Sequence, residues 1–381
     1  PRQAPSGIQR AMTTVAIIGL GTMGLGLAQV YAAAGFPVIA TDAHAPTRDT
    51  ALARLTESLA PRVASGKLTP AARDALLSNL TITRDLAALA SATLAIDAIV
   101  EKLDAKQSLF RDLEALLAPD AILATNTSSL SVASIAAGLK LPDRCLGLHF
   151  FNPAPVMKLV ELIPHTSTSP VALARARKIT EAAGKTVIDA PDRPGFIVNR
   201  CARPYYGEAL AMLDEGRTAS DIDAAMLAAG YRLGPFQLID LIGADINLAA
   251  TEGLHAAMGH HPRYHPFLPL RQQVELGRLG RKSGEGFLFP NDPGPAPHDA
   301  AAIALRIEAT LMNEAAWLLS EGGTTPIGID TAMKLGLNFP RGPFDILRTH
   351  GAPRIRAKLA ALEAATALKG RYLPAPYLET A

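Results

Sequence analysis

The sequence predicts an α/β protein in which a doubly wound parallel sheet is followed by two all-α domains related by internal duplication. Three features of the 381 residues carry this prediction. The chain begins with a strand–glycine turn–helix–strand unit, its strand-like runs end near residue 190, and similar segments recur on either side of a proline-rich linker. Strands that alternate with helices are typical of a doubly wound sheet, and recurrence at a fixed offset is typical of duplication.

The first of these features lies in residues 14–41. A short β-branched run at residues 14–18 stops at Gly19 and predicts a buried parallel strand. Residues 23–34 predict a helix that Gly35 ends, and residues 37–41 predict a second strand. Together these segments form a βαβ unit.

Further apolar runs extend the predicted sheet, and helical segments separate several of them. They are residues 94–100, 122–125, 146–150, 159–163 and 186–188. After the sequence PDRPG at residues 191–195, helical patterns dominate, which places a domain boundary near residue 190.

The two segments that flank the proline-rich stretch 289–297 resemble each other. DAAM at 223–226 matches DTAM at 330–333 (330 − 223 = 107), GPFQLI at 234–239 matches GPFDIL at 342–347 (342 − 234 = 108), and EA at 208–209 matches EA at 314–315 (314 − 208 = 106). We therefore expect a sheet domain at 12–190, a first helical domain at 191–290 and a second, degenerate helical repeat at 298–381. Residues 1–11 are interpreted as a tag or a disordered extension.

Composition excludes several classes of protein. Lys+Arg 37 against Asp+Glu 35 gives a net charge of +2, without the basic stripe that nucleic-acid binding requires. No apolar run approaches the ~20 residues of a membrane helix. Two cysteines, Cys145 and Cys201, are too few for a disulfide framework, so we expect a cytoplasmic protein that associates with neither membrane nor nucleic acid.

A glycine-rich motif, Gly19-Leu20-Gly21-Thr22-Met23-Gly24, follows the first strand. With Asp42 closing the second strand 18 residues later (42 − 24 = 18), this is the dinucleotide fingerprint of a Rossmann-type domain. The residues of the motif are predicted to bind the pyrophosphate, and Asp42 the adenosine ribose, which favours NAD over NADP. The alternatives are a purely structural turn for the motif and a solvated strand end for Asp42.

His149 and Glu161 indicate acid–base catalysis. His149 ends one predicted strand and Glu161 lies on the next, so a short connection can bring the two side chains together. A carboxylate fixes the tautomer of an imidazole and stabilises its protonated form, which suits a general base. The alternative is a buried histidine of the core with no role in catalysis.

Several motifs, in order along the chain, resemble those of the L-3-hydroxyacyl-CoA dehydrogenase family. They are GLGTMGLG (19–26), IVEKLDAKQSLF (99–110), ATNTSSL (124–130), GLHFFNPAPVMKLVE (147–161), PGFIVNR (194–200), GPFQLIDLIGAD (234–245) and GRKSGEGF (280–287). The resemblance covers residues 13–287 and recurs weakly in the last 80 or so.

The resemblance implies an enzyme of fatty-acid β-oxidation type that oxidises an L-3-hydroxyacyl-CoA to the 3-ketoacyl-CoA, with hydride transfer to NAD. It makes His149 the base and Glu161 its partner. It also implies that Ser128 hydrogen-bonds the reacting hydroxyl, and that Asn199 completes the pocket near the thioester carbonyl or the His–Glu pair. Without the resemblance, Ser128 reads as a helix N-cap and Asn199 as a link between backbone groups.

The resemblance also implies ligand contacts. Glu101 and Lys106 would contact the nicotinamide side of NAD, with Asn126 beside them, although Glu101 alone reads as a surface charge. Ser58 and Lys67 are the candidates for binding coenzyme A, whose alternative is a solvated helix face. The sequence departs from the family at two positions, both of which the resemblance places beside the nicotinamide: Asp97 replaces the usual Glu, and Lys102 follows Glu101 where Asn is frequent.

Two other functions fit parts of the pattern. One is an NAD-dependent dehydrogenase of a free hydroxy acid or sugar acid, similar to gulonate dehydrogenase; the other is a non-catalytic NAD-binding protein. A metal site is not expected, because the histidines at 255, 260, 261 and 265 have no carboxylate or thiolate at ligand spacing. The second repeat is interpreted as structural, with the chain a monomer if that repeat replaces the dimer contact, or otherwise a homodimer.

Overall fold

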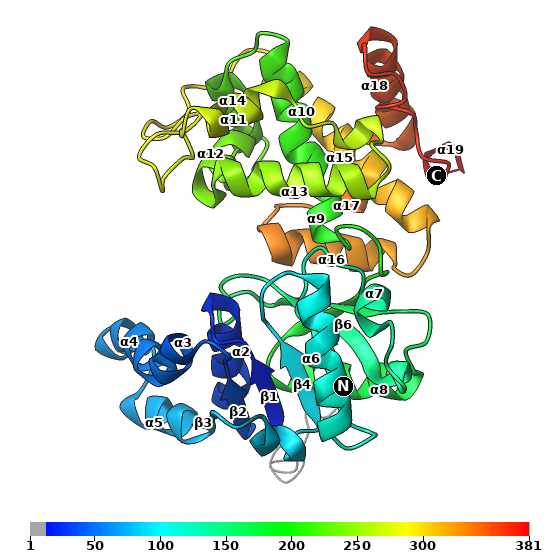
Figure 1. The fold of residues 1–381 in the computed structure, drawn as a ribbon. Coiled ribbons are helices and arrows are strands. Elements are labelled where there is room, and N and C mark those ends of the chain that lie inside the picture. Colours follow the sequence, from blue (N-terminus) through cyan, green and yellow to red (C-terminus); the bar gives the residue numbers. More distant parts are fainter. Residues whose placement is uncertain (1–12, 381) are drawn as a thin grey trace. The chain divides into compact units, whose positions relative to one another are not determined.

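The computed structural model describes residues 13–380, and the chain separates into two compact units, residues 1–193 and 194–381 (Figure 1). The predicted tag or extension at residues 1–11 lies outside the described residues. The first unit contains the sheet, and the second unit contains both of the predicted helical domains.

The first unit is built on one eight-stranded sheet with the order β3-β2-β1-β4-β5-β6-β7-β8. All neighbouring strands are parallel except β6 and β7, which are antiparallel. The predicted doubly wound α/β fold is therefore confirmed. The strands are β1 (Val15–Ile18), β2 (Val38–Thr41), β3 (Leu80–Ile82), β4 (Leu94–Asp97), β5 (Ile122–Thr125), β6 (Cys145–Phe150), β7 (Leu159–Pro164) and β8 (Thr186–Asp189).

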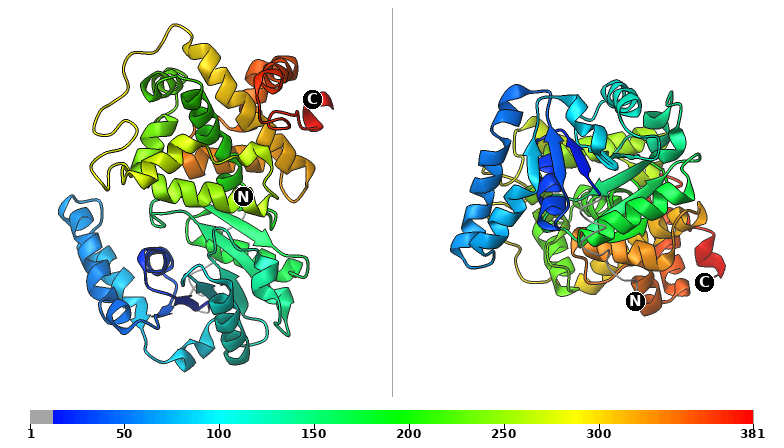
Figure 2. Two further views of the ribbon diagram at one scale, coloured as in Figure 1. Left: turned by 45° about the horizontal axis from the view of Figure 1, so that its top comes forward. Right: turned by 90° about the horizontal axis from the view of Figure 1, so that it is seen from below.

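Helices cover both faces of this sheet (Figure 2). Helices α2, α4 and α8 pack on the face to which Val15, Ile17 and Leu148 point, and α7 packs on the face to which the intervening side chains point. The helices of this unit are α2 (Thr22–Ala33), α3 (Ala45–Asp49), α4 (Ala51–Ala64), α5 (Pro70–Ser78), α6 (Leu103–Leu116), α7 (Val132–Ala136) and α8 (Pro170–Ala182), with short 3₁₀ helices η1 (Leu86–Ser91) and η2 (Pro142–Arg144). Because both faces are covered, the strands are almost wholly apolar, as parallel strands usually are.

The second unit is helical, apart from a single β-bridge between Gly280 and Glu285 in its described residues. Helix α15 is central and packs against α10, α11, α17 and α18. The helices are α9 (Val198–Cys201), α10 (Arg203–Asp214), α11 (Ala219–Ala228), α12 (Pro235–Ile242), α13 (Ala244–Ala257), α14 (Leu268–Glu275), α15 (Ala300–Ser320), α16 (Pro326–Leu337), α17 (Pro343–His350), α18 (Ala352–Ala365) and α19 (Tyr377–Thr380), with η3 (Pro262–Tyr264).

The matching DAAM and DTAM segments serve the same purpose in the two halves of this unit. Asp223 accepts hydrogen bonds from the N–H groups of Phe236 (2.9 Å) and Gln237 at the start of α12. Asp330 accepts one from the N–H of Phe344 (2.7 Å) at the start of α17. The glycine of each GPF sequence is required, since a Cβ there would lie 2.2 Å or 2.3 Å from the aspartate side chain.

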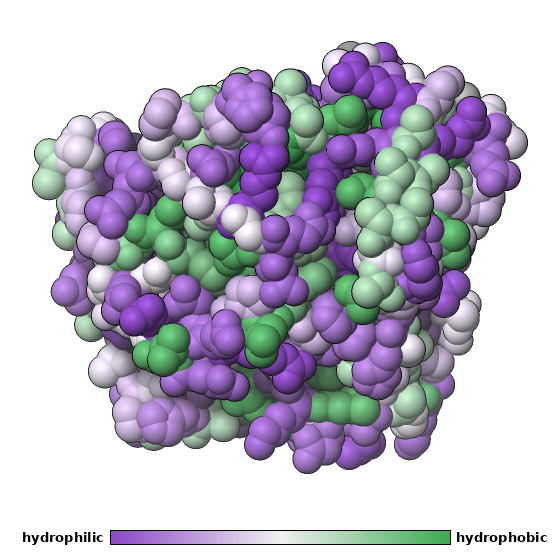
Figure 3. Space-filling view, turned by 90° about the horizontal axis from the view of Figure 1, so that it is seen from above, coloured by the Kyte–Doolittle hydropathy of each residue, from purple (hydrophilic) through white to green (hydrophobic). Residues whose placement is uncertain are grey.

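Polar and apolar residues alternate over the surface seen in Figure 3, with small separate apolar patches. Within residues 13–380, no helix combines the length and the apolar character that crossing a membrane would need. Cys145 and Cys201 are both buried.

Candidate active site

The glycine motif forms the turn between β1 and α2, and each glycine has a distinct physical reason. Gly19 has φ +97°, which side chains disfavour, and a Cβ there would lie 2.6 Å from the Ala98 carbonyl oxygen. A Cβ on Gly24 would lie 1.7 Å from the Gly19 oxygen. Gly21, the N-cap of α2, faces open space instead. The turn therefore leaves room for a pyrophosphate at the helix N-terminus, and the residues present fit NAD.

Asp42 follows β2, close to this turn. Its carboxylate accepts hydrogen bonds from the N–H groups of Leu20 (2.7 Å) and His44 (2.8 Å). A carboxylate has about four acceptor sites, so it retains capacity for ribose hydroxyls. Arg48 also lies near, but its guanidinium binds the Asp42 carbonyl and the Asp49 carboxylate.

His149 and Glu161 are directly opposite each other in the antiparallel pair β6–β7. The His149 Nδ1 lies 2.6 Å from Glu161 Oε2, and both side chains are buried. The Phe151 ring packs against the imidazole, with centroids 4.5 Å apart. The prediction that two strands bring this histidine and this carboxylate together is confirmed.

Glu101, at the end of the segment after β4, is bound by the loop that follows β5. Its Oε1 accepts hydrogen bonds from the hydroxyls of Thr127 (2.6 Å) and Ser129 (3.0 Å) and from the N–H groups of Ser128 (3.0 Å) and Ser129. Burial acts to raise the pKa of Glu101, but the Thr127 hydrogen bond and the positive charge of Lys106 outweigh it and lower the pKa. Glu101 therefore stays ionised and holds the loop that carries Ser128, which is more than the surface charge that its sequence context alone suggested.

Lys106 has different surroundings from those that the resemblance implied. Its side chain is almost wholly buried, and Nζ lies 2.8 Å and 3.1 Å from the two oxygens of Asp97 and 3.5 Å from Glu101 Oε2. In the sequence it was expected to contact NAD directly. In the structure its ammonium is surrounded by two carboxylates, and the aspartate that departs from the family pattern is one of them.

Ser128 is exposed in the loop after β5, and it does not cap a helix. The N-cap of the next helix, α7, is Ser131, whose hydroxyl accepts from the N–H of Ser134. Asn126, at the start of the same loop, accepts a hydrogen bond through Oδ1 from the N–H of Phe150 (2.8 Å). That bond ties the loop to the strand of His149.

The remaining predicted residues lie elsewhere. Ser58 is exposed on α4, where its hydroxyl donates to the Leu55 carbonyl, and Lys67 is exposed in the turn before α5. Asn199 lies on α9 of the second unit, half-buried, and its backbone carbonyl accepts a hydrogen bond from Arg203 Nε (3.1 Å). Within the described residues of the second unit, 194–380, its side-chain amide makes no hydrogen bond.

The sequence reasoning missed Thr127 and Asp192. Thr127 is buried, donates to Glu101 and accepts from the N–H of Leu130. Asp192 caps α7 through the hydroxyl of Ser131 and the N–H groups of the next two residues. Thr127 lies within the quoted ATNTSSL motif and was available as a signal, whereas nothing local links Asp192 to a helix 60 residues earlier. No group of three or more His, Cys, Asp or Glu in the described chain could hold a metal ion.

The chain was compared with known proteins. The NAD-binding-domain model of 3-hydroxyacyl-CoA dehydrogenase matches residues 14–193, and its C-terminal-domain model matches residues 195–289 and 303–381. The chain is 44% identical to the 3-hydroxyadipyl-CoA dehydrogenase of Escherichia coli (strain K12) over 72% of its own length, but this match spans only 58% of that relative.

Two further comparisons cover their counterparts almost completely. The 3-hydroxybutyryl-CoA dehydrogenase of Mycobacterium tuberculosis (strain ATCC 25618 / H37Rv) is 39% identical, over 73% of this chain and 98% of that one. The crystal structure of 3-hydroxybutyryl-CoA dehydrogenase from Escherichia coli K12 superimposes with a TM-score of 0.90 at 32% identity, covering 97% of this chain and 98% of that chain. The protein thus belongs to the 3-hydroxyacyl-CoA dehydrogenase family of NAD-dependent oxidoreductases.

Proposed function

We propose that the protein oxidises L-3-hydroxyacyl-CoA thioesters to 3-ketoacyl-CoA, with His149 as the base and Glu161 as its partner. The observation that carries the proposal is the buried cross-strand pair, in which His149 Nδ1 lies 2.6 Å from Glu161. The pair sits on the same sheet as the glycine turn, in a chain whose family performs this reaction.

The proton chemistry follows from the pairing. Because Glu161 accepts the Nδ1 proton, the neutral imidazole carries its lone pair on Nε2, which takes the proton from the 3-hydroxyl. The imidazolium that forms is stabilised by the carboxylate beside it. NAD, when bound, accepts the hydride from C3 of the substrate.

The NAD-binding residues in this proposal are those of the glycine turn and the strand ends. Gly19, Gly21 and Gly24 shape the turn, and Thr22 and Met23 place N–H groups at the first turn of α2. Asp42 binds the adenosine ribose. Glu101 and Asn126 border the nicotinamide and hold the loop after β5. Lys106 is paired with Asp97 and Glu101 and does not contact the cofactor.

Substrate binding is assigned to Ser128 and Asn199, which we propose as donors to the oxygen atoms of the reacting group. Such donors favour the charge that develops on oxygen in the transition state. Ser58 and Lys67, both exposed, are proposed contacts of coenzyme A. The relatives named above act on acyl groups of different kinds, so the proposal extends to the thioester class and not to one acyl chain.

The test is the NADH-dependent reduction of acetoacetyl-CoA, followed by absorbance. We expect His149→Ala to lower kcat by about 10³-fold or more while leaving the Kd of NADH nearly unchanged, since His149 lies outside the glycine turn. Glu161→Gln should lower kcat less, because the histidine remains. Full turnover by His149→Ala, or oxidation of free hydroxy acids in place of every CoA thioester, would contradict the proposal.

We also propose that the chain is a monomer in which the second helical repeat replaces a partner subunit. The support is a reciprocal set of ion pairs between the repeats. Arg200 and Arg263 of the first repeat bind Glu314 of the second, at 2.7 Å and 2.9 Å. Arg306 of the second repeat binds Glu208 of the first at 2.5 Å.

Equivalent residues thus exchange partners, as they do across the two-fold axis of a homodimer. Glu208 and Glu314 differ by 106 in number, and so do Arg200 and Arg306 (314 − 208 = 106; 306 − 200 = 106). Light scattering during size-exclusion chromatography should give about the 40.0 kDa of one chain, and twice that mass would contradict the proposal. A cytoplasmic location is also proposed, because the sequence contains only two cysteines, too few for a disulfide framework.

A further inference from the structure

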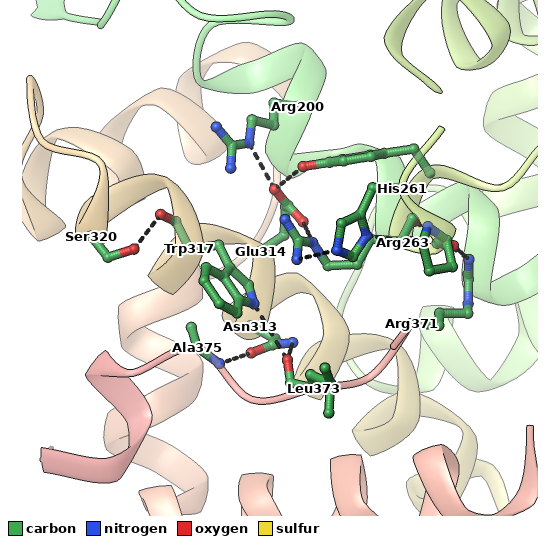
Figure 4. A network of polar contacts seen from close by, with 12 residues as sticks. Arg200, His261, Arg263, Asn313, Glu314, Trp317, Ser320, Arg371, Leu373 and Ala375 are labelled. Carbon is green, nitrogen blue, oxygen red and sulfur yellow. Dashed lines mark hydrogen bonds and ion pairs between the residues drawn. The ribbon is translucent and has the colours of Figure 1, made fainter. Parts of the chain in front are cut away.

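Asn199 lies beside a buried arginine that the second repeat binds. Arg200 follows it in α9, and its side chain is fully buried. The guanidinium donates through Nε to Glu314 (2.7 Å) and through both terminal nitrogens to the two oxygens of Glu321 (2.8 Å and 2.7 Å). Figure 4 shows the carboxylate of Glu314 between Arg200 and Arg263.

Helix α9 is too short to define its own position. It has four residues, Val198–Cys201, and isolated helices of this length are unstable. It packs against α15 and α16, both of the second repeat, and against α10, which begins two residues after α9 ends. Burial acts to lower the pKa of Arg200, but the hydrogen bonds that it donates to Glu321 and the charge of Glu314 outweigh it and raise the pKa, so Arg200 stays charged.

The second repeat contains the same arrangement without the asparagine. Arg306 donates to Glu208 (2.5 Å) and, through both terminal nitrogens, to Glu215 (2.6 Å and 2.7 Å). The residue before it, which corresponds to Asn199, is Leu305 (305 − 199 = 106). The two ion-pair clusters are therefore matched, but only one of them lies next to a proposed substrate-binding side chain.

We infer that Glu314 and Glu321 are positioning residues for the reaction: they hold Arg200, and through it α9 and Asn199, in the geometry that substrate requires. The second repeat then contributes to catalysis as well as to stability. This inference rests on the role proposed above for Asn199.

Glu321 is the informative position for a test, because its side chain is 31% exposed. When Glu321 is substituted, Arg200 is still paired with Glu314. In Glu321→Gln the bidentate contact is lost, and Arg200 keeps its ion pair with Glu314 alone. Displacement of a positioned group by about 1 Å lowers rates by on the order of 10²-fold, so we expect kcat for acetoacetyl-CoA to fall by roughly 10- to 100-fold. The Kd of NADH should not change.

The matched control is Glu215→Gln, which breaks the mirror contact to Arg306. Glu215→Gln should lower the melting temperature about as much as Glu321→Gln does, and it should leave kcat unchanged. Equal kcat values for the two variants would overturn the inference, because a structural role alone affects both equally.

A double-mutant cycle separates this inference from the proposed function. If Glu321 acts through Asn199, Glu321→Gln should have little further effect on kcat in an Asn199→Ala background. An undiminished effect there would overturn the inference. If Asn199→Ala alone leaves kcat unchanged, it is the proposed role of Asn199 that fails; if Asn199→Ala lowers kcat and Glu321→Gln does not, only the positioning role fails.

Discussion

The two helical repeats share their interface and differ in their chemistry. In the first, Arg200 binds two carboxylates of the second repeat, and in the second, Arg306 binds two carboxylates of the first. At the position before each arginine, however, the first repeat has Asn199 and the second has Leu305. A buried charge without its partner is costly in free energy, so both halves of the interface are needed, whereas the proposed substrate site needs only one polar group.

The carboxylates of the interface bind aromatic hydroxyls in the same reciprocal way. Tyr264 of the first repeat donates to Glu314 (2.5 Å), and Tyr372 of the second donates to Glu208 (2.9 Å). The two tyrosines differ by 108 in number (372 − 264 = 108). The comparison therefore teaches that the second repeat keeps the arginine, glutamate and tyrosine contacts that bind it to the first.

Breaking the interface between the repeats should have the largest effect on stability. The effect should be equal whether the glutamate of the first or of the second repeat is removed. We expect Glu314→Ala and Glu208→Ala each to lower the free energy of unfolding by about 3–5 kcal/mol, because each leaves one arginine without a carboxylate and a second arginine with only one. Urea unfolding of the full chain measures this loss. A large loss for one variant and none for the other would show that the interface is not reciprocal.

Exchanging the residues at which the repeats differ should separate chemistry from packing. Asn199→Leu gives the first repeat the side chain of the second, and kcat for acetoacetyl-CoA should fall by about 10²-fold, the usual effect of removing one donor to a developing charge. Leu305→Asn is the reverse exchange, at a half-buried position. It should leave kcat unchanged, and activity loss equal to that of Asn199→Leu would contradict the comparison.

The sheet and the His149–Glu161 pair were predictable because local patterns determine them. Runs of β-branched and aliphatic residues bounded by Gly and Asp became β1, β2 and β5 within one residue of the expected limits. His149 and Glu161 lie on strands joined by a short connection, so pairing them needed only the assumption that the strands are neighbours. The strand β3 was missed because it has only three residues, of which Thr81 is exposed.

Long-range ion pairs were not predictable in this way. Lys106 was expected at the cofactor because of the family resemblance, and nothing local indicated that Asp97 and Glu101 would enclose it. Arg200 and Glu321 are 121 residues apart, and no periodicity links them. The offset between the repeats shows only which residues are equivalent: Arg200 corresponds to Arg306, and Glu215 corresponds to Glu321.

The smallest expected effect concerns the pH dependence of stability at Asp223 and Asp330. The two aspartates occupy equivalent positions in the repeats but have different charged neighbours. Burial raises the pKa of Asp223 to about 7. Burial also raises the pKa of Asp330, but the positive charges of Lys334 and Arg348 act in the opposite direction. The first cap should therefore depend on pH near neutrality more strongly than the second.

The sign follows from proton linkage. Between about pH 4, where an unfolded aspartate titrates, and pH 7, folded Asp223 holds a proton that the unfolded chain has released. Stability is therefore present at low pH and is lost as pH rises through 7. One pKa unit corresponds to about 1.4 kcal/mol, so the wild-type chain should lose more than about 1 kcal/mol relative to Asp223→Asn between pH 5 and pH 8. Urea unfolding at several pH values measures the difference; Asp330→Asn should show a smaller change, and equal changes at both positions would mean that the cations beside Asp330 have no effect on its cap.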